Sequence, residues 1–450
     1  MKKVLAILLA GMMTATAFAG CGGGSSSSTG SNADSKTESK ADDASKGDDG
    51  SKAEADMDPS WADESLFGGE TDITLKVWAP DKAVSLTKEQ VEAFKKHYSN
   101  IKFKSIEVVA QGESDAATQI MNDPEKAADV FGFPSDQLDK LIATKVLSPV
   151  AQGFVNTIKA NNAQKTIDAV AEGDKLYAFP ETNDNGYYLV YDNTVVTDED
   201  AKTLEGVLAA CKAKNKQFIL DSGNGFYSCM FAFTGGALID GFEADGVTQK
   251  FVEYNEDEVI DTLMAFAKLM KDYKNTYSSQ DTANISSSFK NGKAGAGVDG
   301  TWNSQADKDA LGDKFGAAKL PTINVGGTDK QIISMFGYKY IGVNSYTKFP
   351  RSAQILAYYL TGQEAQTQRA QKLGWGPSNT KAQEAVKDDP IIQAVSAQSE
   401  NAVAQVKIAG TFWTPMGTLG SELYKDSWKP EDRNATKTLF DKIISNVKDE

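Results

Sequence analysis

The sequence predicts an α/β protein in which two strand–helix units follow each other along the chain. The first unit starts with an alternating strand at 73–79 and reaches a buried strand at 129–133. The order restarts after Phe179, with a strand at 187–191 and a helix around 204–211. Strands that alternate with helices are typical of a parallel sheet with helices on its faces. Two such units in one chain predict two lobes.

The elements of the first unit follow from periodicity and capping signals. Residues 73–79 alternate apolar and polar side chains, which is typical of a half-buried strand. Thr87 and Gln90 have the spacing of a capping box, so a helix is expected to begin at Thr87. The other expected elements are strands at 101–109 and 129–133, a helix near 114–122, and a helix capped by Ser135.

The second unit repeats this order with longer connections. Expected strands lie at 187–191, 218–220 and 294–298, and an expected helix lies around 204–211. Asn255 is expected to cap a long helix whose inner face carries apolar residues at helical spacing.

The chain begins like an exported lipoprotein. Lys2 and Lys3 precede an apolar run at 4–18 that is too short to span a bilayer and has the layout of a secretory signal. The run ends in the letters FAGC, which resemble a bacterial lipobox, so we expect a signal peptide at 1–20 and lipidation of Cys21. An unmodified cysteine after an ordinary cleavage site is the alternative. The expected location is the extracellular face of the cell membrane.

A polar tether is predicted at 21–69. This segment consists largely of Gly, Ser, Ala, Asp and Lys and has few large apolar residues. Such a segment cannot bury enough surface to offset its chain entropy, so it is expected to link the lipid to the folded part as a flexible coil.

Composition excludes several classes of function. The formal net charge of −15 disfavours binding to nucleic acid. The single histidine, His97, excludes sites that need two imidazoles, and no two cysteines have zinc-site spacing. We therefore expect no metal and no cofactor. Cys211 and Cys229 are expected to be free and buried, with a disulfide as the alternative in an exported protein.

Two motifs could indicate enzymatic chemistry. Residues 295–300 match the dinucleotide pattern G-x-G-x-x-G, but Leu320 stands near the position of the expected acid. A short strand followed by a turn that presents Trp302 is the better interpretation. Glu181 and Asp184 could form a glycosidase pair, although proximity in sequence does not show the separation that such a pair requires.

Aromatic residues recur beside polar ones at the predicted strand ends and connections. Trp78 precedes Asp81 and Lys82, and Trp302 stands next to Asn303. Open α/β sheets bind ligands at such places. A sugar has an apolar C–H face and a hydroxyl rim, so flat rings with neighbouring hydrogen-bonding groups suit it. A place in the core is the alternative for each ring.

Four motifs, with the lipobox and the tether, resemble family 1 extracellular solute-binding proteins of ABC transporters. They are TLKVW at 74–78, ADVF at 128–131, KLYAFP at 175–180 and GTW at 300–302. Within this family the chain is most similar to maltose/maltodextrin-binding proteins, over 71–450. The resemblance implies a two-lobed, type II periplasmic-binding-protein-like fold, in which each lobe has a central sheet flanked by helices and a multi-crossing hinge joins the lobes. The implied lobes are 70–182 plus 336–378 and 183–335 plus 379–450, with crossings near 181–183, 335–337 and 377–380.

The resemblance also implies an oligosaccharide ligand, first of all maltose or maltodextrin, between the lobes. The ligand-binding residues that it implies are Trp78, Asp81, Lys82, Phe133, Asp136, Asp184, Asn185, Phe226, Tyr227, Trp302, Trp375 and Trp413. The chain is one residue shorter before Lys82 than its relatives, and Gln137 replaces an arginine that would be a bidentate donor. Packing at the hinge is the alternative for Trp375.

The expected function is therefore that of a receptor and not of an enzyme. The implied partners are an oligosaccharide, an ABC permease and, through the lipid, the membrane; a monomer is expected. Three alternatives remain open: a receptor of the same fold for another sugar, a polyol or a polyamine; a surface carbohydrate-active enzyme; and a non-catalytic adhesin.

Overall fold

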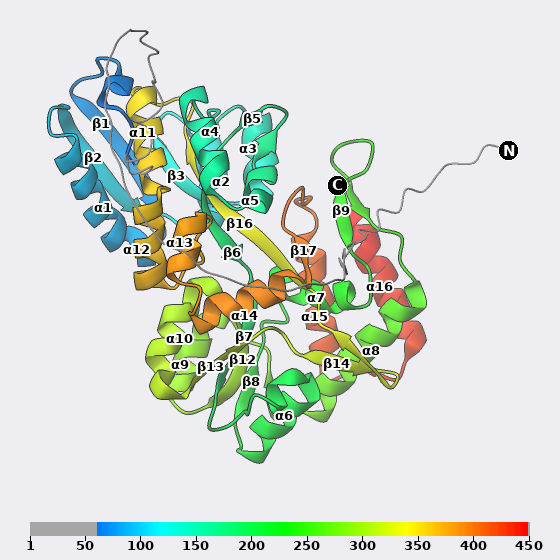
Figure 1. Cartoon of the computed structure of the whole chain (residues 1–450). Helices are drawn as coiled ribbons and strands as arrows, with labels where there is room; N and C mark the ends of the chain where they lie inside the picture. The colour runs from blue at the N-terminus through cyan, green and yellow to red at the C-terminus, as the bar shows by residue number, and fades with distance from the viewer. Residues whose placement is uncertain (1–60, 449–450) are drawn as a thin grey trace, which may run out of the picture. The chain divides into compact units, whose positions relative to one another are not determined.

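The structure is a computed structural model that describes residues 61–448. The predicted signal peptide, Cys21 and most of the tether lie outside the described residues. The described part contains two mixed sheets of six and five strands with helices packed around them (Figure 1). None of its helices is long and apolar enough to cross a membrane.

The six-stranded sheet is mixed and not parallel. Its strands run in the order β17-β16-β3-β1-β2, and β6 pairs with β16. Strand β1 is parallel to β2 and β3, whereas β16 is antiparallel to β3 and β6. The strands are β1 (Ile73–Ala79), β2 (Phe103–Ala110), β3 (Val130–Pro134), β6 (Phe179–Asn185), β16 (Ser334–Val343) and β17 (Ala402–Ala404). The parallel prediction fails because β16, from far along the chain, enters the sheet beside β3.

The five-stranded sheet has the order β11-β8-β12-β7-β13. Strand β7 is antiparallel to both neighbours, and β8 is parallel to β11 and β12. The strands are β7 (Tyr187–Asp192), β8 (Gln217–Ile219), β11 (Tyr277–Ser278), β12 (Ala294–Gly300) and β13 (Phe315–Ala318). Three two-stranded sheets are β4 (Ala171–Glu172) with β5 (Lys175–Leu176), β9 (Ile239–Phe242) with β10 (Gln249–Phe251), and β14 (Thr322–Val325) with β15 (Thr328–Gln331).

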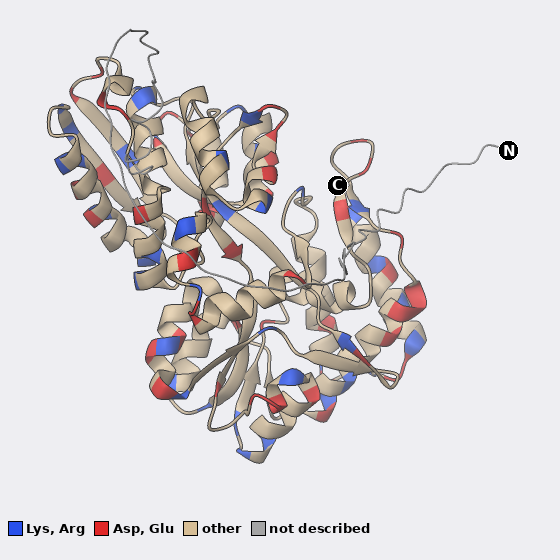
Figure 2. Ribbon diagram, in the orientation of Figure 1, with Lys and Arg blue, Asp and Glu red and all other residues tan. Residues whose placement is uncertain are grey.

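Helices cover both sheets, and Figure 2 shows acidic and basic residues interspersed on them. Those associated with the first sheet are α1 (Val84–His97), α2 (Glu113–Asn122), α3 (Leu138–Ala143), α4 (Gln152–Asn161), α5 (Gln164–Asp168), α11 (Pro350–Leu360) and α12 (Gln363–Leu373). Those associated with the second are α6 (Leu204–Ala213), α7 (Gly225–Thr234), α8 (Glu256–Asp272), α9 (Ile285–Lys290), α10 (Ser304–Leu311), α14 (Pro390–Ser399), α15 (Trp413–Tyr424) and α16 (Arg433–Lys448). Helix α13 (Thr380–Ala385) packs against α12.

Of the predicted helix caps, one is confirmed and two are wrong. The side chain of Asn255 accepts a hydrogen bond from the backbone N–H of Asp257 at the start of α8. Helix α1 begins at Val84, after a 3-10 turn, so Thr87 lies buried inside the helix and does not cap it. Ser135 caps no helix either: its hydroxyl donates to the backbone carbonyl of Gln405, the residue after β17, over 2.6 Å.

Three chain segments run side by side between the sheets. Strand β6 of the first sheet ends at Asn185, and β7 of the second begins at Tyr187. Asn185 pairs with Gly337 of β16, and the backbone N–H of Asn183 donates to the carbonyl of Gly376 over 2.9 Å. The two sheets are therefore linked by more than one chain segment. One buried hydrophobic cluster covers the first sheet and extends to Tyr188, Val190 and Ile219 of the second sheet, and another packs against the second sheet.

Candidate functional site

Three partly exposed aromatic side chains gather at the starts of α7 and α15 and in the turn after β12. The ring centroid of Phe226 lies 5.8 Å from that of Trp302 and 6.3 Å from that of Trp413. The two helices approach closely because Gly225 faces the backbone of Trp413, where a Cβ would lie 2.0 Å from the carbonyl oxygen. Flat rings grouped in this way suit the apolar face of a sugar.

A lysine of the first sheet contacts this aromatic group. The ammonium of Lys339, in β16, lies 5.8 Å from the ring centroid of Trp302 and 4.8 Å from that of Trp375. It forms an ion pair with Glu113 over 2.8 Å, and both side chains are nearly buried. Burial alone would lower the pKa of Lys339, but the charge of Glu113, aided by Asp184 and Glu181, raises it above its usual value.

Lys82 makes a second link between the sheets. Its ammonium donates to the backbone carbonyl of Trp302 over 3.2 Å and to Oδ1 of Asn303 over 2.5 Å. The amide of Asn303 in turn donates to the carboxylate of Asp299 over 2.9 Å. The structure therefore brings together two of the predicted site residues, Lys82 and Trp302.

Buried charges lie behind these contacts. Glu181 and Arg369 are 3.2 Å apart at their nearest atoms and are only 4% and 3% exposed. One carboxyl oxygen each of Glu113, Glu181 and Asp184 has no hydrogen-bond partner among the described residues. Burial raises the pKa of Glu181 to about 7 although Arg369 opposes the shift. The first sheet thus carries a dense, largely dehydrated group of charges beside the aromatic rings.

Trp78 and Asp81 lie at the edge of this group. Trp78 is partly buried and lines a cavity of about 20 Å³ with Glu113, Glu181 and Arg369. A cavity of this size has room for a single water molecule. Asp81 is exposed at the start of a 3-10 turn, and its carboxylate is open to solvent.

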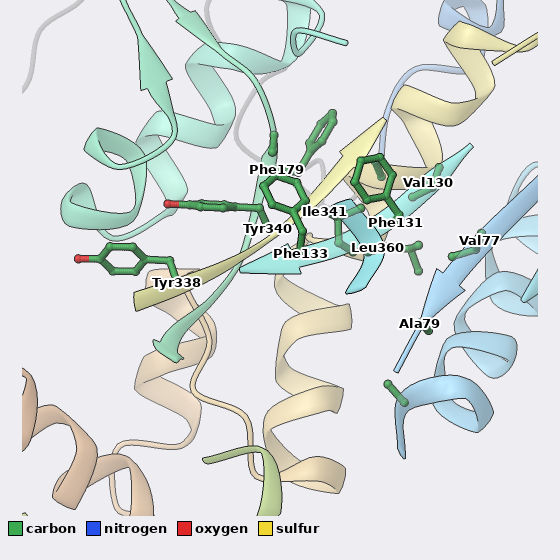
Figure 3. Close-up of a cluster of buried hydrophobic side chains, with 14 of the residues drawn as sticks. Val77, Ala79, Val130, Phe131, Phe133, Phe179, Tyr338, Tyr340, Ile341 and Leu360 are labelled. Carbon is green, nitrogen blue, oxygen red and sulfur yellow. The ribbon is translucent and has the colours of Figure 1, made fainter. Parts of the chain in front are cut away.

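Two predicted stacking rings belong to the core instead. Phe133 is 0% exposed and packs between Phe131 and Tyr340, with centroids 5.6 and 5.9 Å away (Figure 3). Tyr227 is buried, and its hydroxyl donates to that of Thr282 over 3.3 Å. The inward faces of β3 and α7 direct these rings away from solvent, so both lie in the core, which was the alternative expected for each ring. Trp375 is also buried, as the packing alternative expected.

Three predicted polar residues have partners within the protein. Asp184 accepts a hydrogen bond from the backbone N–H of Gly376 and so joins two of the crossing segments. The amide of Asn185 donates to Oε1 of Gln405 over 2.6 Å, and the amide of Gln405 donates to Asp136 over 2.9 Å. Sequence reasoning missed Gln405 because it lies after β17, far along the chain from both partners.

The cysteines Cys211 and Cys229 are free and buried, as predicted.

Asp136 is expected to make stability depend on pH. Burial raises its pKa from 3.8 to about 7, with the hydrogen bond from Gln405 opposing the shift. Between about pH 4 and 7 the folded protein therefore keeps a proton there that the unfolded chain has lost, so this contribution is complete below pH 4 and is lost as pH rises through 7. The upper bound is about 4 kcal/mol. Asp136→Asn should flatten the decline in melting temperature from pH 5 to 8.

Asp123, whose side chain is 47% exposed and pairs with Lys126 over 2.8 Å, offers a control. Asp123→Asn should leave the wild-type slope unchanged. The same slope in wild type and Asp136→Asn would contradict a carboxyl at residue 136 that stays protonated in this pH range.

Aromatic and charged groups that come from two linked α/β sheets are typical of proteins that capture a small solute between two lobes. Residues 89–394 match the family of bacterial extracellular solute-binding proteins. The chain belongs to this family.

Named relatives agree with this assignment. The galactooligosaccharide-binding protein of Bacillus subtilis (strain 168) is 26% identical over 363 residues, which cover 76% of this chain and 82% of the relative. A maltooligosaccharide ABC transporter solute-binding lipoprotein of Streptococcus pneumoniae serotype 4 is 24% identical over 370 residues, 79% of this chain and 85% of the relative. The unliganded maltodextrin-binding protein MalE1 of L. casei BL23 superposes with a TM-score of 0.69 at 25% identity and covers 85% of this chain and 100% of its own.

The comparisons confirm the predicted family and fold. The architecture matches that of maltose-binding-type proteins, with sheets flanked by helices. The family is one of solute-binding proteins, and both named relatives are oligosaccharide-binding proteins by name, the pneumococcal one of an ABC transporter; these are names of receptors and not of enzymes. Consistent with this, the G-x-G-x-x-G residues form the buried strand β12 and not a phosphate-binding loop.

Proposed function

We propose that this protein is the lipid-anchored substrate-binding protein of an ABC importer and captures an oligosaccharide, with maltose or maltodextrin as the leading ligand. The observation that carries the ligand class is the group of partly exposed rings of Phe226, Trp302 and Trp413. Lys82 and Asn303 place hydrogen-bonding groups beside these rings. This combination matches the two surfaces of a sugar.

Capture is proposed to occur between lobes 70–182 plus 336–378 and 183–335 plus 379–450. The strands that link the two sheets would act as the hinge. A ligand that contacts Trp302 on one lobe and Trp78, Asp81 or Lys82 on the other would favour the closed state by its differential affinity. The closed form would then dock on the permease as a monomer.

The membrane anchor is proposed to be lipidated Cys21, exposed after removal of residues 1–20, with the polar tether up to residue 69 as spacer. The lipobox-like FAGC sequence supports it. The pneumococcal relative is itself named a lipoprotein. Mass spectrometry of membrane-extracted protein should find acyl chains on Cys21 and none in Cys21→Ala, which should be released to the medium.

A galactooligosaccharide is the second candidate ligand, because the Bacillus relative is named for one. Aromatic stacking alone does not separate the two, since both sugars offer an apolar face. Competition between maltotriose and a galactosyl trisaccharide at equal concentration should separate them.

The test of the proposed function is a thermal-shift screen of the soluble chain without its anchor. At a concentration of about 100 times the Kd, maltose, maltotriose and maltopentaose should raise the melting temperature by several degrees. Ligands that bind only the folded state stabilise it by mass action. Small-angle scattering should show a more compact particle with ligand, which an adhesin would not give, and reducing ends should not accumulate. A response to polyamines with none to any saccharide would contradict the proposal.

A further inference from the structure

Lys339 occupies a cation-binding box made of aromatic and acidic side chains. Its ammonium lies within 6 Å of the ring centroids of both Trp302 and Trp375, the range in which an indole face attracts a cation. Glu113 completes the box at 2.8 Å. Lys339 itself is 6% exposed.

The carboxyl groups around the box favour a cation inside it. Glu113 on α2 and Glu181 and Asp184 on β6 face the ammonium, and each raises the pKa of Lys339. Arg369 on α12 pairs with Glu181, and Lys82 donates instead to Trp302 and Asn303. Without the charge of Lys339, three buried carboxyl groups would share one guanidinium, which is costly in a dehydrated site.

The box adjoins the surface on which the ligand is proposed to stack. Trp302 contacts Lys339 and lies beside Phe226, which also neighbours Trp413. One indole therefore contributes both to the box and to the exposed aromatic group. A ligand that brought its own cation to this place would meet the ammonium of Lys339.

We propose that Lys339 is a specificity-determining residue: the protein fills this box with its own ammonium, so the site accepts uncharged saccharides and rejects amino sugars and polyamines. The proposal rests on the proposed function in one respect, namely that Trp302 faces the ligand. It separates the oligosaccharide receptor from the polyamine alternative. It also predicts that removing the side chain leaves a site complementary to a small alkylammonium ion.

Lys339→Ala with propylammonium tests the box directly. Millimolar propylammonium should raise the melting temperature of this variant by several degrees and leave wild type unchanged. Lys330→Ala is the matched control, because Lys330 also pairs with a glutamate, Glu258, at 3.4 Å but lies in β15. Propylammonium should leave it unchanged, and sodium chloride at equal ionic strength reports the effect of salt.

Saccharide binding gives the second readout. Lys339→Ala should bind the best saccharide from the screen about tenfold more weakly, because Trp302 loses the ammonium against which its ring packs, and propylammonium should restore much of that loss. It should also gain measurable binding of a glucosamine oligomer. The proposal would be overturned if Lys339→Ala bound the saccharide as tightly as wild type does and did not respond to propylammonium.

The test remains decisive if Lys339→Ala is unstable. If Lys339→Ala does not fold alone, folding upon addition of propylammonium supports the box. If it folds under neither condition, Glu113→Gln/Lys339→Met removes both charges, and saccharide affinity equal to wild type with glucosamine oligomers still rejected would overturn the role of Lys339. A propylammonium response in Lys339→Ala, with no saccharide bound by wild type, would uphold the box and reject the proposed function.

Discussion

Arg369→Leu is expected to lower the free energy of unfolding by about 3–5 kcal/mol, the usual cost of removing one partner from a buried ion pair. Arg369 is 3% exposed, pairs with Glu181, and also donates to the backbone carbonyl of Leu360. Leucine would leave the Glu181 carboxylate buried without its cation. Urea denaturation at pH 8 measures the change.

The loss should be smaller at acid pH. Burial already raises the pKa of Glu181 to about 7, and removal of Arg369 should raise it further. Below that pH the carboxyl is neutral and needs no cation, so Arg369→Leu should be less destabilised at pH 5.5 than at pH 8.

Lys372, on the same helix, provides the control. Its ion pair with Glu89 spans 2.7 Å, but the two side chains are 54% and 59% exposed. Lys372→Ala should cost less than about 1 kcal/mol. Equal losses for Arg369→Leu and Lys372→Ala would show that the buried pair is not a structural requirement.

The strands could be predicted because their signals are local. Alternation at Ile73–Ala79 and the glycine-rich stretch at Ala294–Gly300 both correspond to observed strands. The direction of strands in the sheet could not be predicted in this way, since β16 pairs with β3 from some two hundred residues away. The predicted start of α1 is wrong for a different, local reason. The 3-10 turn at Asp81–Ala83 begins the helical segment earlier than the side-chain spacing suggests.

The site residues likewise differ in whether a local sequence signal reveals them. Trp302 stands out in sequence because a glycine turn presents it, and Trp413 because it follows an aromatic neighbour. Phe133 and Tyr227 have similar neighbourhoods, and only the packing of β3 and α7 shows that they are buried. Lys339 gave no signal, because its role depends on partners at long sequence separation.

Trp302→Ala is expected to weaken saccharide binding roughly 30-fold, about 2 kcal/mol, because it removes the ring that neighbours both Phe226 and Lys339. The side chain is only partly buried, so the fold should survive the change. Isothermal titration with the best saccharide from the screen gives the affinity. Trp428→Ala is the matched control: Trp428 is also partly buried against the core of the second sheet, but it lines a separate cavity with Met270, and this variant should bind normally.

Gly300→Ala tests the position of the ring without removing it. A Cβ at Gly300 would lie 2.2 Å from the indole of Trp302, so the ring must move, whereas the backbone conformation at Gly300 tolerates alanine. If the ligand stacks on the indole, this variant should lose affinity in the same direction as Trp302→Ala, because a displaced ring meets the sugar face less well. Wild-type affinity in both variants would mean that the saccharide binds away from Trp302, and the proposed site would then be wrong even if the receptor function held.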